Sequence, residues 1–386
     1  MPQPNDLSRS PVALKQDTTL IAVIEMSQAS WLVAGIVPGI ERQPLKKLSV
    51  DQEALLQLLH RWREEAARAG RIIKRITVAY EAGRDGFWLA RWLRAHKIEA
   101  FVIHPSSVPV SREHRRAKTD RLDTELLKRA FLGWLRGEPN HCSMAAIPTL
   151  EDEDARRPSR ERESLVRETT RIVNRLKATL ARLGIRAFKL TLTHVLERLA
   201  ALRTPEGAAV PANTLAELRR DVARLRFVKE QIKEIETARA EHLEQASGEG
   251  RSGTVRLLTR VIGVGIETAD MLVQEVFSRN LRDRKAVARY AGLTGAPNES
   301  GQKRRERGLA RAGNARVRRG MIQLAWGFLL HQKNSVLAEW YRTRTAGARG
   351  GMRKTMIVAL ARKLLITLWR LVTTGEAPVG LTLRPA

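Results

Sequence analysis

The sequence predicts an α/β N-terminal domain followed by an all-α coiled-coil arm and an all-α C-terminal domain. Apolar strands alternate with amphipathic helices from residue 20 to about 103, a succession typical of a sheet with helical cover. Apolar residues then recur every three or four positions between 215 and 235, which is the spacing of a coiled-coil seam. With 386 residues, the chain exceeds the usual size of one hydrophobic core. We therefore expect three domains, at residues 1–145, 146–250 and 251–386.

The N-terminal domain opens with two apolar segments that are close enough in sequence to form a hairpin. The expected strands lie at 20–26 and 31–37, with a candidate third strand at 43–50 and two later ones at 75–80 and 98–104. Helices are expected at 51–69, at 86–97 and from about Asp120, because apolar residues there follow helical spacing.

A long helical hairpin is expected after a linker at 133–160. Its second helix carries an apolar seam formed by Leu215, Leu218, Val222, Leu225, Val228, Ile232 and Ile235. The partner helix is expected near 161–183, and the hairpin either has a solvated charged face or also mediates subunit contact. A Gly/Ser-rich segment at 245–254 marks the start of the C-terminal domain, which contains a loop-rich basic stretch between helices.

The charge balance indicates a polyanionic partner. Lys and Arg total 69 against 41 Asp and Glu, giving a net charge of +28 and a pI near 11.3. Nucleic acid is the leading partner and a membrane surface the second. The most apolar late segment, 355–372, is interrupted by Arg362, Lys363 and Arg370, which favours an amphipathic helix over a membrane span. We therefore predict no membrane association.

The N-terminal residues and the cysteine usage point to an intracellular protein. The first 16 residues contain no apolar run before a cleavage site, so no secretory signal is predicted and the expected location is the cytoplasm, associated with the nucleoid. Cys142 is the only cysteine, which excludes a disulfide or a thiolate zinc cluster within one chain.

Four carboxylates are candidates for a cation site. Glu25 interrupts the first strand, Glu81 ends the strand that begins at 75, and Asp120 and Asp123 share one face of a helix. If the sheet has the strand order of ribonuclease-H-like domains, all four meet at one edge. Phosphodiester cleavage can use two hard cations, which prefer oxygen ligands such as these, so we predict Mg²⁺. The alternatives are a helix cap for Asp120 and Asp123 and an edge-strand charge for Glu25.

Basic residues and one glycine turn are candidates for nucleic-acid contact. The residues predicted to contact phosphate are Lys303, Arg304, Arg305, Arg307, Arg311, Arg316, Arg318 and Arg319. The segment 261–272 is typical of a helix-hairpin-helix turn, in which Gly263 and Gly265 let backbone N–H groups approach a phosphate. A solvated charged face and a plain turn between packed helices are the respective alternatives.

Several motifs together resemble the DEDD transposases of bacterial insertion-sequence family 110, including its 1111 branch. They are the acid on the first strand, "YEA", "AKTDRLDTE" and the block "YAGLTGAPNESGQKRRERGLARAGNARVRRGMIQLAW". By this resemblance the four acids are Glu25, Glu81, Asp120 and Asp123, and Ser300 is the nucleophile. The chain departs from the family in having Glu25 where Asp is usual, and "YEAGRDG", with the added acid Asp85, in the second motif.

The resemblance implies a RuvC-like, ribonuclease-H-fold N-terminal domain and a serine recombinase. Ser300 would form a phosphoserine bond to DNA, at a composite site in which the acids of one subunit face the serine domain of another. A bridge RNA would pair with donor and target DNA, and the protein would act as a dimer or tetramer. Two rivals remain open: a Holliday-junction-type nuclease that uses metal-activated water, and a decayed protein that only binds nucleic acid.

Overall fold

The computed structural model describes residues 10, 12–83, 86–108, 119–138, 141–246, 248–279, 281–300, 303–310, 312–347, 350–376 and 379–385. Only the backbone is described at residues 106, 297–300, 303–307 and 350. Packing divides the chain into two compact units, which are residues 1–151 with 280–282 and residues 152–279 with 283–386. The helical arm and the C-terminal helices belong to the second unit, and the three-domain division remains a prediction.

Unit 1 is built on a mixed sheet. Its described strands lie in the order β3-β2-β1-β4-β5-β6. Their bounds are Thr19–Met26 (β1), Trp31–Ile36 (β2), Leu45–Leu48 (β3), Arg75–Glu81 (β4), Glu99–Ile103 (β5) and Met144–Ala145 (β6). Strands β1, β4 and β5 run parallel, whereas β2, β3 and β6 are antiparallel to their neighbours. The predicted α/β character of the N-terminal region is confirmed.

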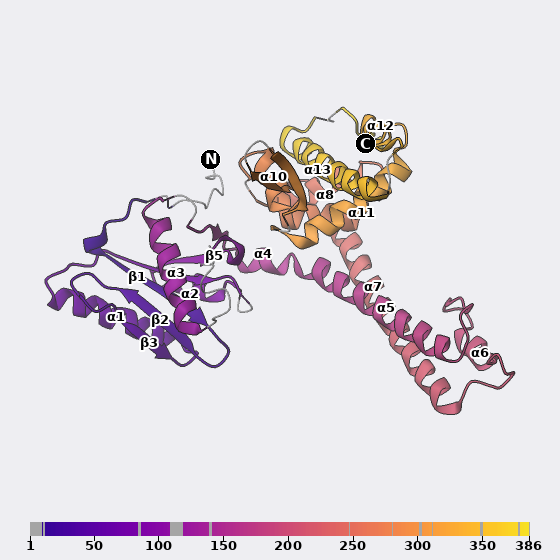
Figure 1. The fold of residues 1–386 in the computed structure, drawn as a ribbon, viewed down its shortest axis with the longest axis horizontal. Helices are drawn as coiled ribbons and strands as arrows, with labels where there is room; N and C mark the ends of the chain where they lie inside the picture. The colour runs from indigo at the N-terminus through magenta and orange to yellow at the C-terminus, as the bar shows by residue number, and fades with distance from the viewer. Residues whose placement is uncertain are drawn as a thin grey trace. The chain divides into compact units, whose positions relative to one another are not determined.

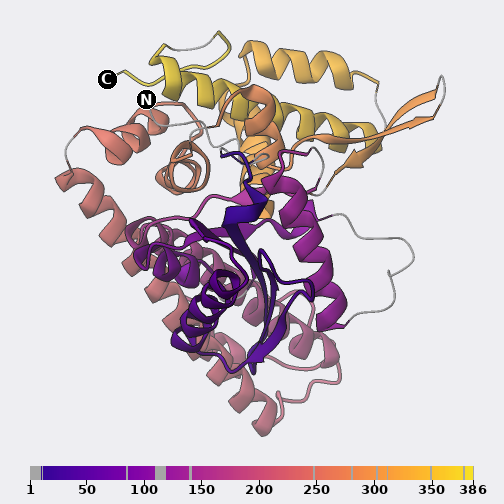
Figure 2. The same ribbon diagram turned by 90° about the vertical axis from the view of Figure 1, so that its left-hand side faces the viewer.

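Helices cover both faces of this sheet. The helices α1 (Gln52–Arg68) and α2 (Trp88–Ala95) pack on one face and α3 (Asp120–Leu135) packs on the other (Figures 1 and 2). Side chains alternate along a strand, so β1 contributes Leu20, Ala22 and Ile24 to the core under α1 and α2. Ile21 and Val23 point the other way and join the core under α3.

The predicted linker at 133–160 is partly wrong, because it supplies the last strand of the sheet. Strand β6 pairs with β5, and the Ser143 carbonyl accepts a hydrogen bond from the His104 backbone N–H at 2.9 Å. A strand of two residues is too short for an alternating pattern to reveal it. The short helix α4 (Leu150–Asp154) follows.

The arm of unit 2 is a pair of long helices. Helix α5 (Arg157–Arg182) packs against α7 (Ala212–Gln245), and the short helix α6 (Val195–Ala200) lies in the connection between them (Figure 1). The ion pairs Arg162–Glu236 and Arg175–Asp221 show that the two helices run antiparallel, since one partner number rises as the other falls. The predicted seam is confirmed as the packing surface by the buried residues Leu218, Val222, Leu225 and Val228.

The rest of unit 2 is mostly helical. Its elements are α8 (Gly250–Thr259), α9 (Ile266–Leu272), the π-helical turn η3 (Val273–Phe277), α10 (Arg284–Tyr290), β7 (Gly295–Ser300), β8 (Lys303–Leu309), α11 (Ala315–His331), α12 (Val336–Thr345) and α13 (Gly350–Thr374). Within the described ranges, none of the helices has the length and apolar character needed to cross a membrane.

The prediction of an all-α C-terminal domain is wrong at one place. Strands β7 and β8 form an antiparallel hairpin, seen as the orange ribbon in Figure 2, where the sequence suggested a basic loop. Neither strand contains a valine, isoleucine or threonine, and Pro297 lies inside β7, so the usual strand signals are missing. The hairpin is therefore visible from its backbone pairing and not from a strand pattern in the sequence.

Candidate functional site

Two of the predicted acids end adjacent parallel strands. Ile24 of β1 is level with Tyr80 of β4, so Glu25 and Glu81 follow side by side at the carboxyl ends of these strands. The alternation that turns Val23 and Ala79 toward α3 places both acids on that same face. Glu81 is exposed and Glu25 is half-buried.

Helix α3 brings the other two acids to the same edge. Its last turn leads to Arg136, which lines a cavity together with Gln16 and Asp17 at the start of β1. The helix therefore runs opposite to β1, and its first turn lies at the carboxyl ends of the strands. Asp120 and Asp123 occupy that first turn.

The helical spacing also sets the face on which these aspartates lie. Residues 120, 123, 127, 130 and 134 form one stripe, and the last three are buried in the core between α3 and the sheet. The stripe thus continues from the buried core to the two carboxylates. Thr119 caps the helix, its Oγ1 accepting from the Leu122 N–H at 3.3 Å, and the helix dipole favours negative charge at this end.

The four carboxylates are suitable ligands for a hard cation, although their side chains do not converge on a common point in this structure. Four carboxylates supply only oxygen atoms, the ligand type that Mg²⁺ prefers. Among the residues that the structure describes, no three His, Cys, Asp or Glu side chains are grouped closely enough to hold a metal ion. Asp85 lies outside the described residues. The backbone thus places the acids at one edge, and side-chain rearrangement would be needed for coordination.

Ser300 is the last residue of β7. Its backbone pairs with Lys303, the first residue of β8, and the next pairs are Glu299 with Arg304 and Asn298 with Arg305. Ser300 therefore lies at the end of the hairpin remote from its root at Gly295 and Leu309. Arg307 also belongs to β8, and Arg311 lies outside the described residues. The hairpin thus contains Ser300 and four of the predicted cationic residues in one short ribbon.

The predicted glycine turn joins α8 to α9. Gly263 has a φ of +90°, a conformation that favours glycine, and Gly265 is the N-cap residue of α9. The turn lines a cavity of about 320 Å³ together with His331 and Arg384. Two helices joined by a glycine turn fit both the helix-hairpin-helix and the plain turn, so contact with nucleic acid remains a prediction.

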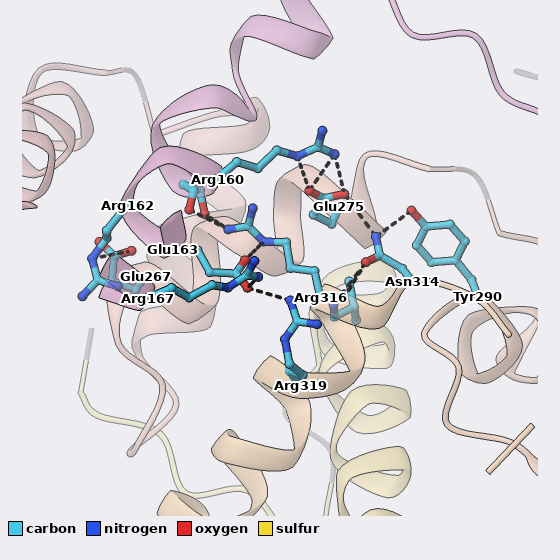
Figure 3. A network of polar contacts seen from close by, with 12 residues as sticks. Arg160, Arg162, Glu163, Arg167, Glu267, Glu275, Tyr290, Asn314, Arg316 and Arg319 are labelled. Atoms are coloured by element: carbon cyan, nitrogen blue, oxygen red, sulfur yellow. Dashed lines mark hydrogen bonds and ion pairs between the residues drawn. The ribbon is translucent and has the colours of Figure 1, made fainter. Parts of the chain in front are cut away.

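Three of the predicted phosphate-binding arginines belong to α11, and they differ in their surroundings; Figure 3 shows two of them, Arg316 and Arg319. Arg316 is turned inward: its Nη2 donates to the carbonyl and hydroxyl oxygens of Ser159, each at 2.7 Å, and its Nε lies 3.2 Å from Glu163. Arg316 therefore makes contacts within unit 2, and its contact with phosphate remains a prediction. Arg319 also contacts Glu163, at 2.7 Å, but remains half exposed, and Arg318 donates to the Ala312 carbonyl at 3.3 Å.

Glu163 is the carboxylate that binds Arg316 and Arg319, and it was not predicted from the sequence. Burial acts against its charge, but hydrogen bonds from Arg319 and Arg167 outweigh it and hold the pKa of Glu163 below its usual range. A cavity of about 290 Å³ lies beside this group, lined by Arg160, Glu163, Arg167, Glu275, Asn314, Arg316 and Arg319. One carboxylate thus joins helix α5 to helix α11.

Glu275 and Asn314 were also missed by sequence reasoning. Asn314 carried a usable signal, because an asparagine directly before a helical segment is a preferred N-cap residue. Glu275 interrupts the apolar segment "MLVQEVF" as Glu25 interrupts its strand, and the same criterion applied to helices would have selected it.

Comparisons with known proteins agree along nearly the whole chain. A DEDD-type insertion-sequence 110 transposase model matches residues 40–185, and a model described as "Transposase IS116/IS110/IS902 family" matches residues 255–342. The first match includes Glu81, Asp120 and Asp123, and the second includes Ser300.

Individual relatives are also named as transposases. The protein y4rJ of Sinorhizobium fredii is 38% identical over 392 residues, covering 98% of each chain. The transposase for insertion sequence element IS1328 of Yersinia enterocolitica is 28% identical, over 77% of this chain and 84% of that protein. A second S. fredii protein, y4qE, is 26% identical over 80% of each.

Proposed function

Because this chain belongs to the IS116/IS110/IS902 family of transposases and is thus a DNA transposase, we propose that it cuts and rejoins DNA through a Mg²⁺-dependent acidic site and the nucleophile Ser300. The observations that support the proposal are the positions of Glu25 and Glu81 at the carboxyl ends of adjacent parallel strands and of Asp120 and Asp123 in the first turn of α3. The strand order, with antiparallel β2 beside β1, supports a ribonuclease-H-like, RuvC-like domain.

The four acids would hold the cation. A divalent ion held there would stabilise negative charge on the phosphate and on the entering and leaving oxygens. Glu25 and Glu81 approach from the strands, while Asp120 and Asp123 approach from a capped helix end whose dipole offsets part of the repulsion among four carboxylates. The added methylene of Glu25 lengthens its reach compared with the aspartate usual in the family.

Ser300 would make the covalent intermediate. In this step the Ser300 Oγ–phosphorus bond forms as a deoxyribose oxygen–phosphorus bond breaks, the hydroxyl proton leaves Ser300, and the departing oxygen takes up a proton. The phosphoserine bond retains the energy of the broken bond, so a second DNA strand can displace Ser300 without ATP. Lys303, whose backbone pairs with that of Ser300, would supply positive charge near the reacting phosphate.

The proposal includes a guide RNA and more than one subunit. A bridge RNA would choose donor and target by base pairing, and the charge of +28 provides for the added polyanion. The acids belong to unit 1 and Ser300 to unit 2, so a composite site could combine the units of different subunits in a dimer or tetramer. These elements rest on the family resemblance together with the charge.

A denaturing-gel assay tests the proposal. Labelled element-junction DNA is incubated with Mg²⁺, the co-purified RNA and wild type, Ser300→Ala, Asp120→Ala or the control Glu99→Gln. Glu99 begins β5 at the opposite end of the sheet and pairs with Arg75 at 2.7 Å, so its removal tests for general damage to unit 1. We expect a protein–DNA adduct in wild type and Glu99→Gln only.

Other outcomes favour the rivals. Cleavage that survives in Ser300→Ala, with no adduct in any sample, would indicate a nuclease that uses metal-activated water. Binding without cleavage in every sample, with and without added guide RNA, would indicate a protein that only binds nucleic acid. Loss of the adduct in Glu99→Gln as well would show that the assay reports on folding of unit 1.

A further inference from the structure

Glu275 is a buried carboxylate in the π-helical turn η3, with only 2% of its surface exposed. Its Oε1 accepts from Arg160 Nε at 3.0 Å, and its Oε2 accepts from Arg160 Nη2 at 3.3 Å and from Asn314 Nδ2 at 3.2 Å (Figure 3). Burying a charge is costly unless it is paired and hydrogen-bonded. Removal of any of these three hydrogen bonds should therefore disturb the other two.

The wide helical turn is what places this carboxylate. The Ser278 N–H donates to the Val273 carbonyl at 2.8 Å, an i to i+5 bond in place of the usual i to i+4 bond. Val273 and Val276 are buried on either side of Glu275 in the sequence. Because π-helical turns are frequent at functional sites, the contacts of Glu275 are candidates for a functional role.

Asn314 uses both ends of its amide. Its Oδ1 accepts from the backbone N–H groups of Arg316 at 3.0 Å and Val317 at 3.3 Å, which caps α11. Its Nδ2 donates to Glu275 and also to Tyr290 Oη at 3.2 Å. Its backbone N–H donates to the Tyr290 carbonyl at 2.7 Å. Glu275 therefore fixes the orientation of the residue that starts α11.

The same residues adjoin the root of the Ser300 hairpin. Next to the ends of β7 and β8, the Ala310 N–H donates to the Thr294 carbonyl at 3.1 Å. Gly313 has a φ of +80°, and a Cβ there would lie 2.6 Å from the carbonyl oxygens of Arg289 and Tyr290. The residues before β7 and those after β8 are thus closely packed next to Asn314.

The first turns of the arm helix α5 hold this arrangement from the other side. Arg156 Nε donates to the Gln274 carbonyl at 3.2 Å, next to the Arg160–Glu275 pair. Arg316 of α11 reaches back to Ser159. The beginning of the arm therefore contacts both the π-helical turn and the helix that follows the hairpin.

We infer that Glu275 is a positioning residue for Ser300, which sets the hairpin through Asn314 and couples it to the arm through Arg160. The inference rests on the proposed role of Ser300 as the nucleophile. A movement of the arm on assembly would reach the serine hairpin through the Arg160–Glu275–Asn314 contacts, beside the separate link from Glu163 to α11. Glu275 itself touches no reacting atom in this scheme.

The test compares Glu275→Ala and Glu275→Gln with Asp221→Ala in the full-length protein with its RNA. Asp221 is a matched control, because it is an equally buried carboxylate held by Arg175 and Arg224, but it lies within the arm. Two quantities are measured: amide hydrogen exchange across residues 295–309, and the rate of adduct formation at saturating DNA. The Kd for DNA is measured in parallel.

For Glu275→Ala we expect exchange in 295–309 to rise and the adduct rate to fall, each about 10-fold or more, since partners of a lost buried carboxylate are left unsatisfied. The Kd should stay within about 2-fold, because no DNA contact is removed. Glu275→Gln should recover part of both effects, as its amide oxygen still accepts from Asn314. Asp221→Ala should leave the hairpin exchange and the adduct rate as in wild type.

The inference is overturned if Glu275→Ala keeps wild-type hairpin exchange and adduct rate, or if Asp221→Ala changes them equally. Should Glu275→Ala not fold, Arg160→Ala removes the arm contact from the half-exposed side of the pair and is judged by the same criteria. If wild type forms no adduct, the proposed function fails, and the exchange measurement still decides whether Glu275 sets the hairpin.

Discussion

At the scale of single residues, Glu25 is the proposed ligand at which the family resemblance implies an aspartate. Its carboxylate stands beside Glu81 at the carboxyl ends of β1 and β4, half-buried on the face that α3 covers. A glutamate there supplies the same oxygen donors as an aspartate from a longer side chain. The charge, more than the length, should therefore decide whether a cation is held.

We expect Glu25→Asp to retain Mg²⁺-dependent cleavage and Glu25→Gln to lose it by about 100-fold or more, the size expected for one lost electrostatic contact. Gln is nearly the same size as Glu, so the loss would report charge and not packing. Initial cleavage rates across a Mg²⁺ titration measure the effect. Equal activity of Glu25→Gln and wild type at all Mg²⁺ concentrations would remove Glu25 from the proposed site.

Gly313 is a second residue with a sharp expected effect. Substitution by alanine is strained by the φ of +80° and would bring Cβ to 2.6 Å from two carbonyl oxygens, so Gly313→Ala should destabilise unit 2 by about 2 kcal/mol or more. Gly327 in α11 is the matched control, since nothing lies within 4 Å of its added Cβ. Gly327→Ala should be neutral or stabilising by up to about 1 kcal/mol. Denaturant unfolding measures both, and an equal loss in the two variants would contradict the expectation.

At the scale of elements, the arm carries a buried charge within its apolar packing. Asp221 of α7 is bound by Arg175 of α5 at 2.6 Å and by Arg224 at 2.8 Å. The hydrogen bond from Arg175 is the main cause that lowers the pKa of Asp221 below its usual value. A buried ion pair of this kind can fix the register of two helices, because every other alignment leaves the charge unpaired.

The lowered pKa predicts how the arm responds to acid. A carboxylate whose pKa in the folded state lies below its unfolded value of about 3.9 stabilises the fold at pH values above 3.9. This stabilisation is lost as the pH falls through the pKa of the folded state. Wild type should therefore lose more stability than Asp221→Asn between about pH 5 and pH 3. Calorimetric Tm values of both proteins across this range test the point, and parallel curves would show that Asp221 does not contribute.

The elements also show what local sequence patterns can and cannot predict. Strands β1 and β4 are short continuous apolar runs and the seam of α7 follows helical spacing, so these local patterns predicted them correctly. The hairpin of β7 and β8 lacks that periodicity and was missed. Glu25 and Glu81 could be selected as candidates because they lie at the ends of recognisable strands, whereas Glu275 was missed because its partners lie 39 and 115 residues away in the sequence.

At the scale of the whole molecule, charge governs the expected response to salt. A protein that neutralises DNA phosphates releases counterions, so its affinity falls steeply as salt rises, with a logarithmic slope of about −0.9 per contact. The net charge of +28 gives this chain many cations for such contacts. The slope therefore gives the number of phosphate contacts, and its change in a variant shows whether the replaced cations make such contacts.

We expect the triple change of Lys303, Arg304 and Arg305 to alanine to reduce the slope by about 2 to 3, because each lost phosphate contact removes about 0.9. Replacing the exposed Arg61, Arg63 and Arg68 of α1 removes the same net charge, and we expect the slope to stay nearly unchanged. Fluorescence anisotropy between 50 and 300 mM salt, roughly the range in which such slopes are read, measures both. Equal slopes for the two triple variants would place the hairpin cations outside the DNA contact.

The π-helical turn has a consequence for insertions and deletions. It accommodates one residue more than a regular helical turn, and each residue of an α-helix rotates the chain by about 100°. Deleting one residue within Val273–Phe277 would restore a regular helix and so spare the local backbone bonding. Part of the segment would nevertheless turn by about 100°, carrying either Glu275 or the residues that follow it out of alignment with Arg160. Relatives that tolerate length changes elsewhere in unit 2 should keep this segment at constant length.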